Sequence, residues 1–90
     1  KPHGALYNDA AKDPARARGI ARAVKAAGKG LWLVGLPNSE MEKAAAAEGI
    51  PYAAEFFADR AYEDDGSLVP RSRPGAVIHD EDACVARVTA

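Results

Sequence analysis

The most constraining feature of the sequence is a predicted strand, helix and second strand that follow one another closely. The run Leu31–Gly35 is apolar, short and bounded by glycines, which is typical of a strand buried on both faces. Ser39 begins a predicted helix, Glu42 completes a capping box with it, and Gly49 ends the helix. Residues 52–56 form the second predicted strand. A strand–helix–strand unit of this length requires a parallel sheet, so the predicted fold class is α/β.

A second predicted helix lies upstream, over residues 13–28. Asp13 supplies a side-chain acceptor at its start and Pro14 suits the first helical position. In a parallel α/β protein, a helix at this place implies another strand before Lys1. We therefore expect the chain to be part of a larger sheet.

Residues 58–75 are rich in charge, proline and glycine and are predicted to form one long loop. Residues 75–78 form either a short strand or the entry to the next helix. A final helix is expected to start at Asp80 or Glu81 and to run through residue 88. Within the predicted elements, Trp32 is expected in the core and the thiol of Cys84 in a buried, inert position.

Composition excludes several classes of protein. The formal net charge is −1 and the chain is 48% hydrophobic, which is typical of a folded protein and favours neither nucleic acid nor an anionic membrane as partner. No apolar run approaches the roughly 20 residues that span a bilayer, and we expect no signal peptide. Cys84 is the one cysteine, which excludes an internal disulfide and favours a reducing compartment, the cytoplasm.

Ligands of parallel α/β proteins bind beyond the carboxyl ends of the strands. The first polar group at such a place contains Lys1, His3, Tyr7 and Asn8, around a turn at residues 2–4. Lys1 and His3 are two residues apart, so an extended backbone directs them to the same side, where they suit an anionic substrate and proton transfer. The alternative is an exposed loop with a surface lysine and histidine.

The second polar group follows the second strand and contains Glu55, Asp59 and Arg60. Glu55 suits a general base or a substrate-orienting group, whereas Asp59 and Arg60 suit either a site edge or a structural ion pair. Arg71 and Arg73 flank a turn further on and suit a carboxylate or phosphate unless they are simply exposed. The chain has two histidines and no Cys/His cluster, so we predict no metal site complete within it.

Three phrases carry a resemblance to a known family. They are KPHGALYN at residues 1–8, EFFADRAY at 55–62 and GSLVPR at 66–71. In this order and spacing they resemble the LamB/YcsF family, the A subunit of the bacterial ATP-dependent 5-oxoprolinase. The resemblance implies a fragment of a distorted (β/α) barrel of the glycoside hydrolase/deacetylase type. Members of that family are longer, so residues 1–90 are expected to be a single partial domain, the C-terminal part of a barrel whose N-terminal strands are missing.

The resemblance also implies an activity, the ATP-driven hydrolysis of 5-oxo-L-proline to L-glutamate together with two partner subunits. ATP, bound by or shared with those subunits, would activate the lactam carbonyl as a phosphorylated intermediate. Whether a metal joins from the missing part stays open. The implied catalytic residues are Lys1, His3 and Glu55, and the implied substrate-binding residues are Tyr7, Asn8, Asp59, Arg60 and Arg71.

Two other functions are compatible with the residues. One is a non-catalytic binding or structural module, and the other is a carbohydrate deacetylase-like hydrolase suggested by kinship of fold. If the chain is a fragment of a barrel, we expect it to be inactive alone and to self-associate through its uncovered sheet edges.

Overall fold

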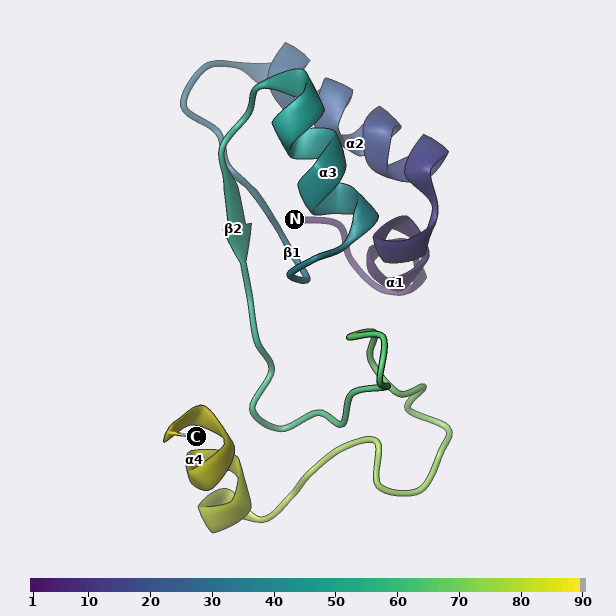
Figure 1. The fold of residues 1–90 in the computed structure, drawn as a ribbon, viewed down its shortest axis with the longest axis vertical. Helices are drawn as coiled ribbons and strands as arrows, with labels where there is room; N and C mark the ends of the chain where they lie inside the picture. The colour runs from purple at the N-terminus through teal and green to yellow at the C-terminus, as the bar shows by residue number, and fades with distance from the viewer. Residues whose placement is uncertain (90) are drawn as a thin grey trace. The chain divides into compact units, whose positions relative to one another are not determined.

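The computed structural model describes residues 1–89 and contains two compact units, Lys1–Glu55 and a second that starts at Phe56. The first unit holds five of the elements that Figure 1 labels. They are α1 (Ala5–Lys12), α2 (Pro14–Ala27), β1 (Leu33–Gly35), α3 (Glu40–Glu48) and β2 (Tyr52–Ala54). The second unit holds α4 (Glu81–Thr89). The expectation of a single partial domain stays a prediction.

β1 and β2 form a parallel pair, and α3 connects them. Leu33 is opposite Tyr52 and Gly35 is opposite Ala54. One further backbone bond, from the Glu55 N–H to the Gly35 carbonyl at 2.9 Å, continues the pairing one residue beyond the end of β2. The predicted strand–helix–strand unit and its parallel sheet are therefore confirmed, although each strand is shorter than predicted.

Of the two hydrogen bonds of the predicted capping box at the start of α3, the one accepted by Ser39 is present and the one from Glu42 back to Ser39 is not. The Ser39 hydroxyl accepts a hydrogen bond from the Glu42 N–H at 3.4 Å, as expected of the cap. The Glu42 carboxylate, however, accepts from the N–H of Asn38 at 2.9 Å and not from that of Ser39. Asn38 has a positive φ of 54°, which turns its N–H toward this carboxylate.

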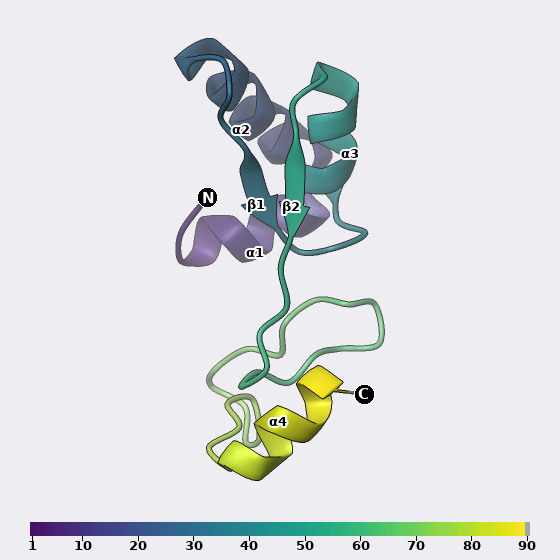
Figure 2. The same ribbon diagram turned by 90° about the vertical axis from the view of Figure 1, so that its left-hand side faces the viewer.

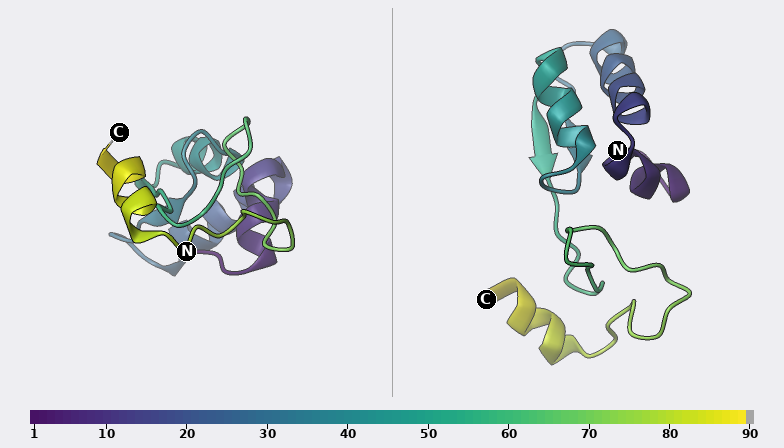
Figure 3. Two further views of the ribbon diagram at one scale, coloured as in Figure 1. Left: turned by 90° about the horizontal axis from the view of Figure 1, so that it is seen from below. Right: turned by 45° about the vertical axis from the view of Figure 1, so that its right-hand side comes forward.

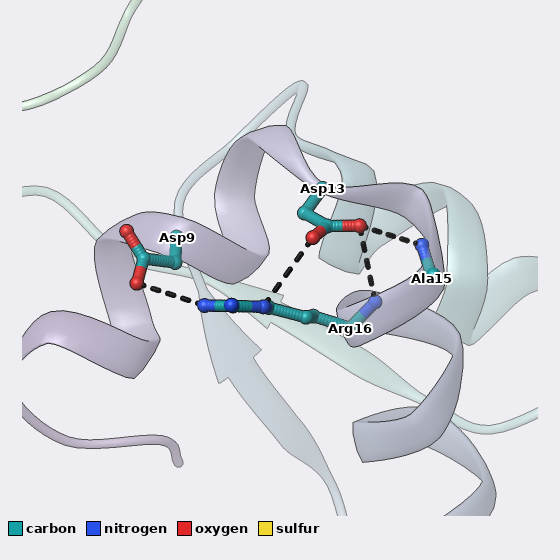
Figure 4. Close-up of polar contacts among 4 residues, drawn as sticks. All are labelled: Asp9, Asp13, Ala15 and Arg16. Carbon is teal, nitrogen blue, oxygen red and sulfur yellow. Dashed lines mark hydrogen bonds and ion pairs between the residues drawn. The ribbon is translucent and has the colours of Figure 1, made fainter.

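Asp13 begins α2 as predicted, and Figure 4 shows its contacts. Its Oδ1 accepts hydrogen bonds from the N–H of Ala15 at 3.0 Å and of Arg16 at 3.3 Å. The Arg16 side chain then joins two helices, because its Nη1 lies 3.0 Å from Asp9 Oδ2 while its Nε lies 3.4 Å from Asp13 Oδ2. These exposed charges fix the short connection between α1 and α2.

Helix α1 was not predicted, because the sequence interpretation placed residues 1–8 in a polar loop. The helix starts after Gly4, which offers no side-chain cap, so the usual start signal is absent. Its apolar spacing is nevertheless helical: Tyr7 and Ala10 are three residues apart and both are buried.

The core of the first unit lies between the sheet and the helices. Leu33, Leu36 and Met41 are fully buried there. Figures 1 and 2 show α1, α2 and α3 on the same side of the two strands, and no helix of residues 1–55 covers the opposite face. Trp32, which was predicted in the core, is 60% exposed, so that prediction was wrong. It precedes β1, and alternation along the chain directs it away from the side on which Leu33 is buried.

The second unit contains an ordered loop rather than an irregular one. Arg60 pairs with Val77, and Tyr62 with Leu68, in isolated antiparallel bridges. The Ala61 N–H donates to the Ala76 carbonyl, and the Ala61 carbonyl accepts from the Val69 N–H. Residues 59–62 therefore run between the segment around Val69 and the segment around Ala76. Of the two predictions for residues 75–78, the short strand is therefore the closer one. Figure 3 shows this loop in green between β2 and α4.

Helix α4 begins after Asp80, whose Oδ1 accepts hydrogen bonds from the N–H groups of Asp82 and Ala83 at 3.0 and 3.4 Å. This confirms one of the two predicted starts. Cys84 is half-buried and not fully buried as predicted, and its thiol lies 3.6 Å from the Ile78 carbonyl oxygen. Among residues 1–89, no helix has both the length and the apolar character that a membrane crossing requires.

Candidate functional site

Lys1 and Glu55 meet at the carboxyl end of β2. The Lys1 Nζ lies 2.9 Å from Glu55 Oε1 and 3.1 Å from Oε2, so the ammonium contacts both carboxylate oxygens. Glu55 is the first residue after β2, and its own N–H bonds to Gly35, the last residue of β1. Backbone pairing therefore holds the carboxylate at the edge where ligands of parallel sheets bind.

Tyr7 completes this cluster from helix α1. The Lys1 Nζ lies 5.5 Å from the centroid of the Tyr7 ring, within cation–π distance. Tyr7 is buried, whereas the Lys1 and Glu55 side chains keep 36% and 24% of their exposure. The cluster thus holds a cation and an anion side by side next to the buried Tyr7 ring, with both side chains partly exposed and Glu55 Oε1 itself buried.

Tyr52, which the sequence interpretation did not select, connects β2 to the loop after β1. Its hydroxyl donates a hydrogen bond to the Leu36 carbonyl at 2.6 Å and lies 3.3 Å from the Ser39 hydroxyl. Ser39 also donates to the Leu36 carbonyl, at 2.8 Å. Burial raises the pKa of Tyr52; the charges of Glu42 and Glu55 add to the rise and the Ser39 hydrogen bond opposes it. The hydroxyl therefore stays protonated and keeps the loop in place.

The tyrosine hydroxyl fits there because residue 35 has no side chain. A Cβ at Gly35 would lie 2.5 Å from the Tyr52 hydroxyl oxygen and 2.7 Å from Met41 Cε. The sequence signal for this place is Gly35 itself, because a glycine inside an apolar strand marks a position where another group comes close. The glycine does not show which group that is.

Two residues of the first predicted polar group lie outside the Lys1–Glu55 cluster. His3 and Asn8 are exposed, and neither side chain forms a hydrogen bond or ion pair within the described part of the chain. Asn8 follows Tyr7 directly on α1, so the two side chains point in different directions around the helix, whereas His3 precedes the helix. The first unit thus brings Lys1, Tyr7 and Glu55 together, and their catalytic or binding roles remain predictions.

The remaining predicted site residues belong to the second unit. Asp59 and Arg71 are exposed, and the carbonyl of Asp59 accepts a hydrogen bond from the Ile78 N–H. Arg60 is 8% exposed, and its Nη2 donates to the Val69 carbonyl at 3.2 Å. The Asp59–Arg60 ion pair that was considered as an alternative does not form among residues 1–89.

Two aromatic rings lie beside these residues in the second unit. Phe56 and Tyr62 stack with ring centroids 5.4 Å apart, and the Tyr62 hydroxyl accepts a hydrogen bond from the Phe57 N–H. The Arg87 guanidinium of α4 lies 5.5 Å from the Phe56 centroid and 5.9 Å from that of Tyr62. This contact fastens α4 to the beginning of its own unit. In residues 1–89, no three His, Cys, Asp or Glu side chains come together in a group that would hold a metal ion.

Comparison with protein families gives a match over residues 1–90 to the LamB/YcsF family. The chain belongs to the LamB/YcsF family. The 5-oxoprolinase A subunit of Alkaliphilus metalliredigens is 56% identical over 88 residues, which are 98% of this chain and 34% of the relative. The 5-oxoprolinase A subunit of Erwinia tasmaniensis is 54% identical over 85 residues, 94% of this chain and 35% of the relative.

A solved structure extends the comparison to the LamB/YcsF fold. The crystal structure of a lactam utilization protein from Thermus thermophilus matches with a TM-score of 0.83 and 46% identity, over 96% of this chain and 35% of that one. The expected fold class, an α/β fragment of a larger barrel with parallel strands, is confirmed by this match. The LamB/YcsF chain described here spans about a third of the length of these relatives.

Proposed function

We propose that this LamB/YcsF chain is part of a 5-oxoprolinase A subunit, which hydrolyses 5-oxo-L-proline to L-glutamate with ATP and two partner subunits in the cytoplasm. The observation that carries the proposal is the identity of 54–56%, over nearly the whole chain, to relatives named as the A subunit of 5-oxoprolinase. The phrases that hold Lys1, Tyr7, Glu55 and Arg60 all lie within the matched residues.

The Lys1–Glu55 pair supports this chemistry. In the ATP-driven reaction the lactam carbonyl oxygen accepts the γ-phosphoryl group of ATP and ADP leaves. Water then adds to the carbonyl carbon, the ring C–N bond breaks to free the amine, and a second water splits the resulting acyl phosphate into the carboxylate and phosphate. In our proposal the Lys1 ammonium donates to the oxygen that carries negative charge at this carbon. The Glu55 carboxylate, 2.9 Å from Lys1, takes the proton of the attacking water and returns one to the leaving nitrogen.

The other predicted residues have supporting roles in this proposal. His3, exposed near the same end of the chain, assists proton transfer, and Tyr7 and Asn8 of α1 contact the substrate. Asp59, Arg60 and Arg71 of the second unit contribute to substrate binding. None of these roles follows from the contacts alone; the family relationship supports them.

ATP is proposed as the co-substrate that drives the reaction, bound with the partner subunits. We assign the binding of ATP to the partner subunits because, among residues 1–89, the Lys1 ammonium of this cluster is already paired with both oxygens of Glu55.

The test is reconstitution of the full-length natural protein with its partner subunits. We expect L-glutamate to form from 5-oxo-L-proline only when ATP is present, with ADP and phosphate released in step. A protein that binds 5-oxoproline without turning it over would support the alternative of a binding module. Release of acetate from acetylated oligosaccharides would support the deacetylase-like alternative. Either result would contradict the proposal.

A further inference from the structure

Arg60 is a buried cation that has no oppositely charged partner among residues 1–89. Arg60 is 8% exposed, yet no carboxylate among residues 1–89 forms an ion pair with it. Within the described residues, its guanidinium donates one hydrogen bond, to the uncharged carbonyl of Val69. Its Nε is fully buried and has no hydrogen-bond partner in the described part of the chain. A buried charge with so few partners is costly, and proteins normally pair such a group with an anion.

The nearby acidic groups are otherwise engaged or exposed. Glu63 binds Arg73 at 2.9 Å, and Asp65 accepts hydrogen bonds from Ser67. The Asp59 side chain is exposed, and its backbone carbonyl accepts a hydrogen bond from the Ile78 N–H. Among residues 56–89, the unit that contains Arg60 therefore supplies no counter-charge to it.

The loop holds Arg60 firmly in this position. Its backbone pairs with Val77 in an antiparallel bridge, and the following residue, Ala61, bonds to Ala76 and to Val69. The guanidinium crosses the loop to the Val69 carbonyl. A planar guanidinium fixed in this way is preorganised for a planar oxyanion, because its N–H groups match two oxygens at once.

We propose that Arg60 binds a carboxylate group that residues 1–89 do not supply. One buried positive charge balances a monoanion, whereas a phosphate carries more negative charge than Arg60 alone can neutralise, since Arg73 is already paired and Arg71 is exposed. The carboxylate has two possible sources. One is the carboxylate of 5-oxoproline, in which case Arg60 determines specificity and the inference rests on the proposed function. The other is an aspartate or glutamate elsewhere in the natural protein.

Ligand binding without ATP tests the first source. The full-length natural protein is titrated calorimetrically with 5-oxo-L-proline and with 2-pyrrolidinone, the same lactam without its carboxylate. Arg60→Gln is expected to weaken 5-oxoproline binding by about 10- to 100-fold and to leave 2-pyrrolidinone binding unchanged. If the glutamine variant fails to fold, Arg60→Lys replaces it, because lysine retains the positive charge. This variant should lose part of the preference for 5-oxoproline over 2-pyrrolidinone. The matched control Arg73→Gln, an exposed arginine of the same loop, should bind both as the wild type does.

Urea unfolding tests the second source. If a protein carboxylate pairs with Arg60, Arg60→Gln leaves both affinities unchanged but lowers the unfolding midpoint at neutral pH. That loss should begin to shrink below about pH 4, where carboxyl groups of the unfolded chain take up protons while the paired one in the folded protein is still ionised. The proposal is overturned if Arg60→Gln changes neither ligand affinity nor the midpoint, or if inorganic phosphate competes with 5-oxoproline far better than acetate does. Because the titration needs no turnover, failure of ATP-driven hydrolysis would be a separate result.

Discussion

Lys1 and Glu55, 54 positions apart in the sequence, are joined by an ammonium that contacts both carboxylate oxygens, at 2.9 and 3.1 Å. The contact ties the beginning of the first unit to its end. Since both side chains remain partly exposed, the pair contributes less than about 1 kcal/mol to stability. Loss of the pair is therefore expected to change the free energy of unfolding only slightly.

The first prediction concerns Glu55→Gln, which removes the charge and the basic oxygen with little change in shape. We expect kcat/KM for 5-oxoproline to fall by about 10²- to 10⁴-fold, the range typical of a lost general base. The unfolding midpoint in urea should change little. Glutamate formation by the reconstituted enzyme measures the first effect.

The matched control is Glu48→Gln. Glu48 is also a half-buried acid in an ion pair, with Arg22 at 3.8 Å, but it lies at the end of α3, where the loop leading to β2 begins. Its substitution should leave kcat/KM unchanged. Equal losses in the two variants would contradict a chemical role for Glu55.

The second prediction concerns the Tyr52 hydroxyl. Tyr52→Phe removes the hydrogen bond to the Leu36 carbonyl, but that carbonyl keeps its bond from Ser39. We therefore expect the free energy of unfolding to fall by only about 1 kcal/mol. Ser39→Ala should cost more, up to about 2 kcal/mol, because Ser39 also caps α3. Urea titrations of both variants measure the difference, and a reversed order would show that the cap matters less than the tyrosine.

The third prediction is a loss of stability at alkaline pH. Burial raises the pKa of Tyr52 in the folded protein above its ordinary value of 10.0. Between these two pKa values the unfolded chain has lost the proton and the folded chain still holds it. Tyr52 therefore contributes fully to stability below pH 10.0, and its contribution falls as the pH rises toward the folded pKa.

Urea midpoints measured from about pH 8 to about pH 11 test this dependence. We expect the wild type to lose stability more steeply than Tyr52→Phe over the upper part of this range. Parallel curves for the two proteins would show that Tyr52 does not titrate differently in the folded and unfolded states.

The fourth prediction compares two glycines. Gly35→Ala places a methyl group against the Tyr52 hydroxyl and Met41, both of which are held in place, and should cost about 1–3 kcal/mol. Gly19→Ala, in the interior of α2 with nothing within 4 Å of the new methyl, should stabilise by up to about 1 kcal/mol. Thermal unfolding of the two variants should shift in opposite directions. A Gly35→Ala protein as stable as the wild type would mean that the neighbouring side chains move aside easily.

Much of the fold was predictable because its signals are local. Asp13, Ser39 and Asp80 are helix caps that the sequence displays directly, and each begins a helix in the structure. Helix α1 was missed because Gly4 carries no such signal. Trp32 was misplaced because an apolar run does not reveal that only one face of the sheet is covered within residues 1–55.

The candidate site was harder to predict because it depends on contacts between distant residues. Lys1 and Glu55 were both selected, yet their direct contact required knowledge of where β2 ends. Arg60 was selected as a substrate-binding residue or part of an ion pair, but its burial depends on the pairing of two loop segments with residues 60–62. Tyr52 was not selected, because the hydrogen bond of its hydroxyl to Leu36 depends on the space that Gly35, in the other strand, leaves by having no side chain.

The close approach of Tyr52 to Gly35 restricts the order in which this protein can change. A lineage that acquires a side chain at position 35 must first give up the hydroxyl at position 52 or reshape Met41, because the three groups share one space. Substitutions at these positions are therefore expected to occur together among family members. A lone alanine at position 35 beside an intact tyrosine and methionine should be the rarest combination.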